Sequence, residues 1–249
     1  MKPECYDAQV HILGRLTPAT TMGISVSVAT GLYGVSFGAL SVAAGLSLWQ
    51  TMALSALMFT GGSQYAFIGV IASAGGVGHL ANVAGTGMSA LGAASLLGVR
   101  NGIYGIQNNA RLRLHGWRKL LAAHVTIDES TAVASAQLDT SEIKRGFWVA
   151  GIGVWLLWNL FTLIGALLGA AMGDPAAWGL DGAAVAAFCG LLWPRLRSGD
   201  AVALAVLCGA LTLIAVPTVP AGVPILIAAL VAAVVGMAQM KIRPQAKRA

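Results

Sequence analysis

The chain has 249 residues, of which 57% are hydrophobic and 10% charged, with a formal net charge of +6 and a mean hydropathy of +0.78. Soluble domains carry about 25% charged residues, so this composition excludes a disordered chain, a coiled coil and an ordinary soluble enzyme. The apolar runs are continuous rather than alternating, which argues against a β-barrel. We predict an all-α, polytopic membrane helix bundle, a single integral membrane domain over 1–249 with about six to eight transmembrane segments.

The apolar runs, taken in chain order, fall at about 20–44, 48–73, 80–106, 146–172, 182–194, 201–217 and 223–240, with a weaker helix at about 120–137. In the first run, Gly31, Gly34 and Gly38 share one helix face. Such a stripe of small residues lets another helix approach closely.

The positive charge fits membrane topology better than nucleic-acid binding, because the basic residues stand between the apolar runs. Twelve of the fifteen Lys and Arg residues fall at the N-terminus, in 111–119, in 195–197 and in the C-terminal tail. Positively charged loops are retained in the cytoplasm, so all four are predicted there, with 1–16 and 241–249 as cytoplasmic tails.

This orientation requires two segments that do not cross the membrane. If every apolar run crossed, the 111–119 loop would lie opposite the N-terminus. The conflict disappears if 48–73 is a broken, re-entrant hairpin and 182–194, which is too short to span, is another. The two would enter from opposite faces, as in an inverted repeat, and leave six full crossings. The alternative, a run that crosses as two half-helices together with one miscounted neighbouring run, would give seven crossings.

The break in the second run is the first candidate for chemistry. Two adjacent glycines in a membrane helix, Gly61 and Gly62, release backbone groups at depth, which is tolerated where the break lines a cavity. Ser63 is predicted to N-cap the following half-helix, whose free N–H groups would suit a carboxylate, with Gln64 beside it. The alternative is a plain kink or a surface turn.

A polar cluster in the third run is the second candidate. Arg100 is followed by Asn101 and Tyr104 in an otherwise apolar stretch. Charges within membranes are costly and are usually paired or face a cavity. The alternative places Arg100 near the cytoplasmic end, with its side chain reaching the headgroups.

The weaker helix carries the titratable residues. His124, Asp128, Thr131 and Ser135 are spaced four, three and four apart, which places them on one helix face, while Glu129 is turned about 100° away. Carboxyl groups beside a histidine at depth could relay a proton. The alternative is a capping box in which Thr126 caps the helix and Glu129 stands three residues later. The histidines and cysteines show no metal-ligand spacing, so we expect neither a metal nor a cofactor.

Several short motifs in fixed order resemble one family. They are Gly34-Val35-Ser36-Phe37-Gly38-Ala39-Leu40, Ala43-Ala44-Gly45-Leu46-Ser47, Phe59-Thr60-Gly61-Gly62-Ser63-Gln64-Tyr65-Ala66, Arg100 with Tyr104-Gly105, Asp128-Glu129 and Gly179-Leu180-Asp181. Over roughly 18–240, the chain resembles the AzlC-type large subunit of branched-chain amino acid exporters, the LIV-E type permeases. The resemblance implies export of valine, leucine, isoleucine or similar small hydrophobic amino acids across the bacterial inner membrane, with a small AzlD-type membrane subunit as partner.

Some positions depart from the family pattern. The family has Asn two residues before the matching Arg and His just after it, where this chain has Gly98 and Asn101. The Thr that commonly precedes the acidic pair is Ile127 here, and the Pro often found in the short run after Gly-Leu-Asp is absent at 185–186. These changes bear on the substrate more than on the fold.

Together these observations predict a secondary, proton-coupled exporter, neither an enzyme nor a nucleic-acid-binding protein. The predicted substrate-binding residues are Gly61, Gly62, Ser63, Gln64, Arg100, Asn101 and Tyr104; the predicted proton-coupling residues are Asp128, Glu129 and His124; and Asp181 marks a second helix break, unless it only caps a helix. The alternative functions are a membrane channel or a non-transport membrane scaffold subunit. An intramembrane enzyme using His124 and Asp128 would lack a second catalytic motif.

Overall fold

The computed structural model describes residues 16–79, 83–172, 189, 192–193, 196–219 and 223–242, and every regular element within them is a helix. Two stretches, Pro18–Ala43 and Thr140–Ala171, are long and apolar enough to cross a membrane. This agrees with the predicted membrane helix bundle. The 182–194 segment and Asp181, predicted as a second break, lie almost wholly outside the described residues.

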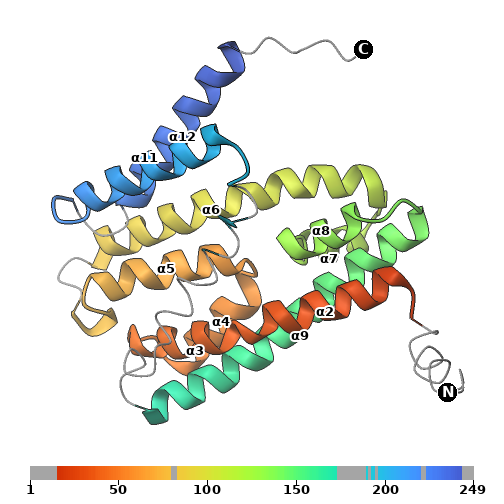
Figure 1. Ribbon diagram of the computed structural model, residues 1–249. Coiled ribbons are helices and arrows are strands. Elements are labelled where there is room, and N and C mark those ends of the chain that lie inside the picture. The colour runs from red at the N-terminus through yellow and green to blue at the C-terminus, as the bar shows by residue number, and fades with distance from the viewer. Residues whose placement is uncertain are drawn as a thin grey trace, which may run out of the picture.

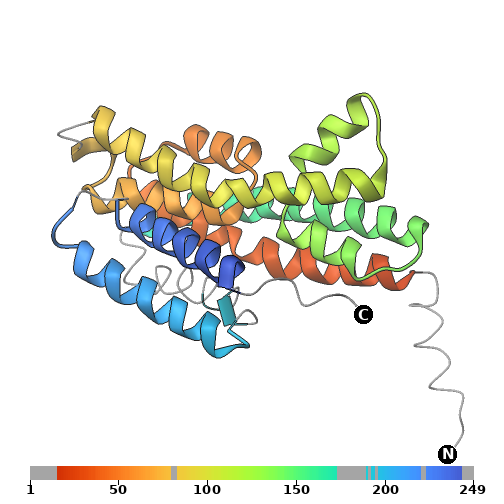
Figure 2. The same cartoon turned by 90° about the horizontal axis from the view of Figure 1, so that it is seen from above.

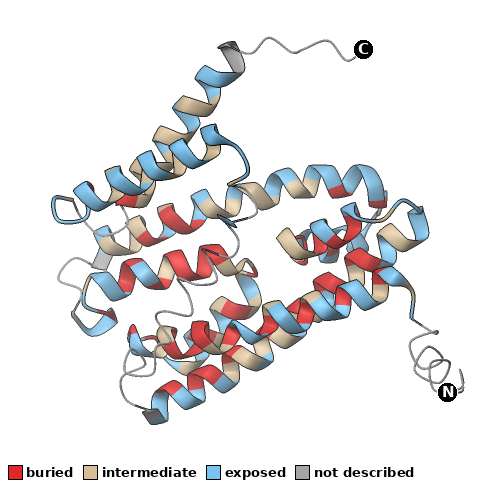
Figure 3. Ribbon diagram, viewed as in Figure 1, coloured by how far each residue is buried: buried red, intermediate tan, exposed pale blue. Residues whose placement is uncertain are grey.

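The first long rod is made of α2 (Pro18–Leu32) and α3 (Gly34–Ala43), which meet at Tyr33. Thr17 starts it by accepting a hydrogen bond from the backbone N–H of Thr20. The rod runs parallel to α9 (Thr140–Met172) along most of its length (Figure 1). Buried residues gather along the contact of this rod with α9 (Figure 3).

The predicted glycine stripe makes this close contact. A Cβ placed on Gly34 would lie 2.7 Å from the carbonyl oxygen of Trp158 on α9, and one on Gly38 would overlap the carbonyl oxygen of Thr162. From the other helix, a Cβ on Gly165 would overlap the carbonyl oxygen of Val35. The two backbones therefore touch directly, which only glycine permits.

We expect Gly38→Ala to destabilise the protein by about 1–3 kcal/mol, because the added methyl group meets backbone that cannot turn away. Thermal unfolding in detergent measures the effect. Gly209→Ala, in α11 (Gly199–Ala215) where nothing lies within 4 Å of an added Cβ, is the control and should be at least as stable as the wild type, because alanine favours a helix more than glycine. Equal unfolding temperatures for the two variants would contradict this account of the α3–α9 contact.

The first broken segment comprises α4 (Leu48–Leu57) and α5 (Gly61–Ser73). The helix is interrupted at 58–60, directly before the glycines at which the sequence predicts the break, and Gly61 and Gly62 form the first turn of α5. The Gln64 side-chain amide donates to the carbonyl oxygens of Leu54 and Ser55, at 3.0 and 3.2 Å, and so satisfies acceptors near the end of α4. The prediction that Ser63 is the N-cap is wrong: Thr60 occupies that position without a side-chain bond, and Ser63 lies within the first turn.

After the short 3₁₀ turn η1 (Val77–His79), α6 (Val83–Leu112) runs back along the bundle. A second broken segment follows, made of α7 (Trp117–His124) and α8 (Asp128–Ser135). The prediction of one continuous helix over 120–137 is therefore wrong. The residues at the break, Val125-Thr126-Ile127, are all β-branched, which disfavours a helix.

Hydroxyl groups hold this second break in place. The Ser130 hydroxyl donates to the carbonyl oxygen of Val125 at 2.8 Å and accepts from the backbone N–H of Ile127 at 3.0 Å. Thr126 donates back to Ala122 and does not cap α8, so the capping box with Glu129 is not formed.

The two broken segments enter the bundle from opposite ends. The connections α3–α4 and α5–α6 lie at one end, and the start of α2 with the connections α6–α7 and α8–α9 lies at the other (Figure 1). At the latter end, Asp139 accepts from the backbone N–H groups of Ser141 and Glu142 and caps α9. The Ser141 hydroxyl, which also donates to Asp139, and these N–H groups lower the pKa of the Asp139 carboxyl below its ordinary value.

The last described helices, α11 (Gly199–Ala215) and α12 (Val223–Ile242), pack against each other beside α6 (Figure 2). They lie on the side of α6 opposite α9 (Figure 1). The region between the two helix breaks is therefore built by α2 to α9.

Candidate functional site: a cavity between the two helix breaks

A cavity of about 330 Å³ lies where the two broken segments meet. It draws residues from α2, α5, α6, α8, α9 and the first break. The residues around it are Ala29, Thr30, Tyr33, Phe59, Thr60, Gly61, Gly62, Tyr65, Arg100, Asn101, Ile127, Asp128, Glu129, Val154 and Trp158. Charged, polar and apolar groups thus share one space.

An ion pair forms one side of the cavity. Arg100 Nη1 on α6 lies 2.9 Å from Asp128 Oδ2 at the start of α8, with 33% of the first side chain and 17% of the second exposed. Arg100 Nε and Asp128 Oδ1 are buried and have no hydrogen-bond partner among the described residues. The ion pair therefore keeps one buried donor and one buried acceptor that a ligand could bind. Most buried polar atoms in folded proteins have a hydrogen-bond partner, so these two are unusual.

The second carboxylate, Glu129, faces a different helix. Its Oε1 accepts a long hydrogen bond, 3.5 Å, from the hydroxyl of Thr30 on α2. The two neighbouring acids at the start of α8 are thus tied to different partners, Asp128 to α6 and Glu129 to α2.

The N-terminus of α5 opens into the same space. Thr60 caps it only with its backbone, so the first N–H groups of α5, at Gly61 and Gly62, receive no side-chain cap. Together with the helix dipole, such groups favour a negative charge. A Cβ on Gly61 would lie 3.2 Å from the Trp158 ring, so the glycine keeps this surface open.

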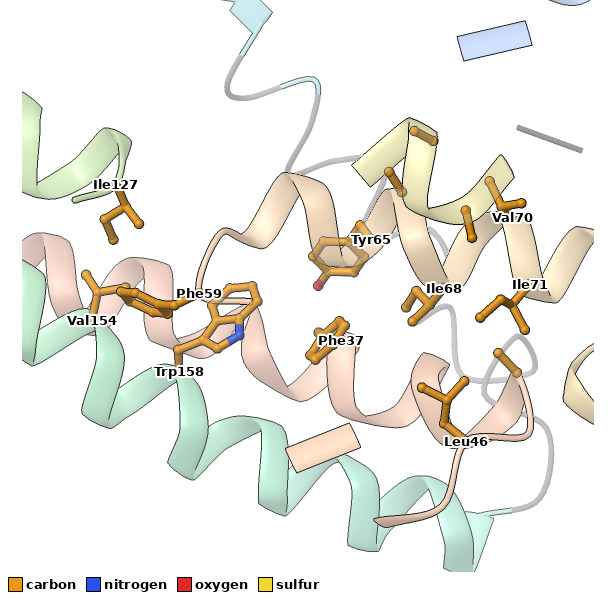
Figure 4. Close-up of a cluster of buried hydrophobic side chains, with 14 residues drawn as sticks. Phe37, Leu46, Phe59, Tyr65, Ile68, Val70, Ile71, Ile127, Val154 and Trp158 are labelled. Carbon is orange, nitrogen blue, oxygen red and sulfur yellow. The ribbon is translucent and has the colours of Figure 1, made fainter. Parts of the chain in front are cut away.

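An apolar wall completes the cavity. Trp158 packs near Phe37 and Tyr65, with ring centroids 6.0 and 6.3 Å away, and Phe59 and Val154 continue the wall toward Ile127 (Figure 4). The Tyr65 hydroxyl donates to the carbonyl oxygen of Tyr33 at 2.9 Å, which fixes the aromatic group against the α2–α3 junction.

The structure thus brings together six of the predicted residues, Gly61, Gly62, Arg100, Asn101, Asp128 and Glu129. Ser63, Gln64, Tyr104 and His124 do not line the cavity. Gln64 supports the α4 break, and the buried Ser63 hydroxyl lies beside α6, where a Cβ on Gly98 would be 3.5 Å from it.

The predicted common face of His124, Asp128, Thr131 and Ser135 is wrong, because the helix breaks between the first two. His124 ends α7 and packs near the rings of Phe59 and Trp155, with centroids 6.1 and 6.5 Å away. The other two residues face α6: Asn108 donates to Thr131 at 2.9 Å, and Arg111 donates to Ser135 at 2.7 Å.

Sequence reasoning missed Thr30, Tyr33, Phe59, Val154 and Trp158 as cavity residues. Trp158 stands in a long apolar run, where a tryptophan is typical of interfaces and packing. Only the pairing of α9 with the two breaks shows that it faces a cavity. No group of three potential metal ligands occurs within the described part of the chain.

A family model described as AzlC protein matches residues 25–172, more than half of the chain. The chain belongs to the AzlC family. This is a transport family, associated with branched-chain amino acid export and known to work with a small partner subunit. The AzlC match includes both helix breaks and every cavity residue. No protein of curated function and no solved structure is significantly similar to the chain.

Proposed function

We propose that this AzlC-family chain is a secondary transporter that exports branched-chain or similar small hydrophobic amino acids across the bacterial inner membrane in exchange for protons. The mixed character of the cavity supports this function: it combines unpaired polar atoms on an Arg–Asp pair, uncapped helix N–H groups and an aromatic and aliphatic wall. A zwitterionic amino acid with an apolar side chain presents the complementary groups.

In this proposal the substrate carboxylate lies against the N-terminus of α5, at Gly61 and Gly62, within reach of Arg100 and Asn101. Its ammonium group lies toward the carboxylates of Asp128 and Glu129, and its side chain against the Trp158 wall. The volume of about 330 Å³ suits a small molecule, since ligand pockets begin at about 300 Å³.

The helix arrangement supports a carrier. The α2–α3 rod followed by a broken segment, and α6 followed by a second one, run in opposite directions, as the two units of an inverted repeat do. In carriers of this kind, half-helices meet at a central site that opens to each side in turn. The coupling energy is assigned to the proton gradient, with Asp128 and Glu129 as the candidate carriers.

The end of the bundle that holds the α6–α7 and α8–α9 connections is assigned to the cytoplasm, with both termini. Its basic residues include Arg113, Arg118 and Lys119, and Lys144 and Arg145 near the start of α9 add to them. A cysteine introduced at His115 should react with an impermeant reagent only from the cytoplasmic side. Labelling of this cysteine from outside in intact cells would show that the protein has the opposite orientation. The small AzlD-type subunit is the proposed partner.

Transport tests the proposal directly. The full-length chain, with its small subunit where one co-purifies, is reconstituted into vesicles loaded with leucine, isoleucine or valine. We expect saturable exchange of labelled substrate, and accumulation when a pH gradient is imposed. A channel would equilibrate substrate without counterflow, and a scaffold subunit would move none, so either result would reject the proposal.

A further inference from the structure

The two adjacent acids at the start of α8 have different surroundings, although both line the cavity. Asp128 is held by the guanidinium of Arg100 at 2.9 Å. Glu129 has only the Thr30 hydroxyl, at 3.5 Å. Within the described residues, no Lys, Arg or His lies within ion-pair distance of Glu129.

This difference decides which acid can change its charge. Protonating Asp128 would leave Arg100 as an unpaired cation with two thirds of its side chain buried, which is costly. Glu129 has no ion-pair partner to lose, and the charge of a half-buried carboxylate without a cation beside it is itself costly. Protonation of Glu129 therefore removes a cost, whereas protonation of Asp128 creates one.

The other groups around Glu129 do not compete for this role. The cavity receives Thr30 from α2, Tyr33 from the α2–α3 junction, Tyr65 from α5, Arg100 from α6, and the apolar Val154 and Trp158 from α9. A tyrosine hydroxyl in water ionises only near pH 10. The acid pair and Arg100 are thus the groups that set the charge of the cavity.

We propose that Glu129, and not Asp128, carries the coupling proton, and that Thr30 positions it. This rests on the proposed amino acid transport. With Glu129 protonated, the Arg–Asp–Glu group is neutral, and with it ionised, the group carries one negative charge that a substrate ammonium balances. Substrate binding from the cytoplasm releases the Glu129 proton to the cytoplasmic water, and substrate release outside lets the carboxylate take a proton from the outside.

The Thr30 hydrogen bond links the charge of Glu129 to the contact between α2 and α8. The Thr30–Glu129 bond is the described polar link between α2, in the long rod, and the tip of α8. A hydroxyl donates more strongly to an ionised carboxylate than to a neutral one. The bond therefore strengthens when the proton leaves and weakens when it returns, which changes how tightly α8 is held against α2.

The test measures protons released when leucine binds to the full-length protein in weakly buffered detergent solution with a pH indicator. Wild type should release protons, and Glu129→Gln should release none. Asp128→Asn, which disturbs the Arg100 pair, should bind leucine more weakly but still release protons when saturated.

Transport in vesicles gives a second readout. In Glu129→Gln, the accumulation driven by a pH gradient should fall at least about tenfold, and it should fall more than leucine counterflow does. Thr30→Val should shift the pH profile of counterflow, and Thr30→Ser should restore it.

A second measurement avoids variants. A hydrophobic carbodiimide reacts with protonated carboxyl groups, and peptide mapping of the wild-type chain should locate the adduct on Glu129, with leucine slowing the reaction. Proton release that persists in Glu129→Gln and disappears in Asp128→Asn, or an adduct on Asp128, would overturn the assignment. Wild type that exchanges leucine without response to a pH gradient would overturn it while leaving the proposed function intact. Wild type that neither binds nor exchanges any of the three amino acids would overturn both.

Discussion

Replacing Arg100 by glutamine should abolish leucine counterflow and also destabilise the protein. The substitution removes the cation that faces the cavity and leaves Asp128 as an unpaired acid. Breaking a fully buried ion pair costs about 3–5 kcal/mol, and we expect roughly 1–3 kcal/mol here because a third of the Arg100 side chain is exposed. Thermal unfolding and counterflow measure the two effects separately.

The double variant Arg100→Gln with Asp128→Asn separates binding from stability. It leaves no unpaired charge, so its unfolding temperature should return toward that of the wild type while transport remains lost. Arg111→Gln is the matched control, because Arg111 lies on the same helix but bonds to Ser135 outside the cavity. It should transport within about twofold of wild type, as expected for a surface substitution. Wild-type transport by Arg100→Gln would remove this residue from the proposed site.

Gly61→Leu should reduce leucine binding at least tenfold, because the new side chain would occupy the space between α5 and Trp158 where the substrate carboxylate is proposed to lie. Gly61→Ala should be milder, since its Cβ would meet the far edge of the Trp158 ring at 3.2 Å. Gly69→Leu tests the same change on the exposed side of the same helix, where nothing lies within 4 Å of an added Cβ. Equal binding by the two leucine variants would place the substrate elsewhere.

The first helix break could be predicted from the sequence because two adjacent glycines mark it. The second could not, because Val125-Thr126-Ile127 contains neither glycine nor proline. Its turn depends on hydroxyl bonds from Ser130, and a serine near a helix start is too common to indicate a break by itself. The visible indication of the second break in the sequence is the weaker apolar pattern of 120–137. That pattern fits a short half-helix as well as it fits a weakly hydrophobic transmembrane helix.

The pairing of Arg100 with Asp128 shows a different limit. Each residue can be singled out as a costly charge within an apolar stretch, but they stand 28 positions apart with a loop and a half-helix between them. Whether they meet depends on α7 turning back so that α8 runs beside α6. In contrast, the stripe of Gly31, Gly34 and Gly38 correctly predicted a close helix contact. Small residues repeated on one face of a membrane helix are typical of a surface that another helix approaches closely.

The two kinds of helix contact divide the bundle mechanically. Between the α2–α3 rod and α9, backbone meets backbone through interlocked glycines, and sliding by a fraction of a turn would force atoms into one another. Between α6 and α8, the contact is a row of hydrogen bonds and one ion pair, which water or substrate can replace one at a time. The first contact therefore holds its helices in one register, whereas the second can separate one interaction at a time. In the carrier proposed above, the Arg100–Asp128 contact is the part expected to open, while the glycine contact with α9 is expected to stay in place.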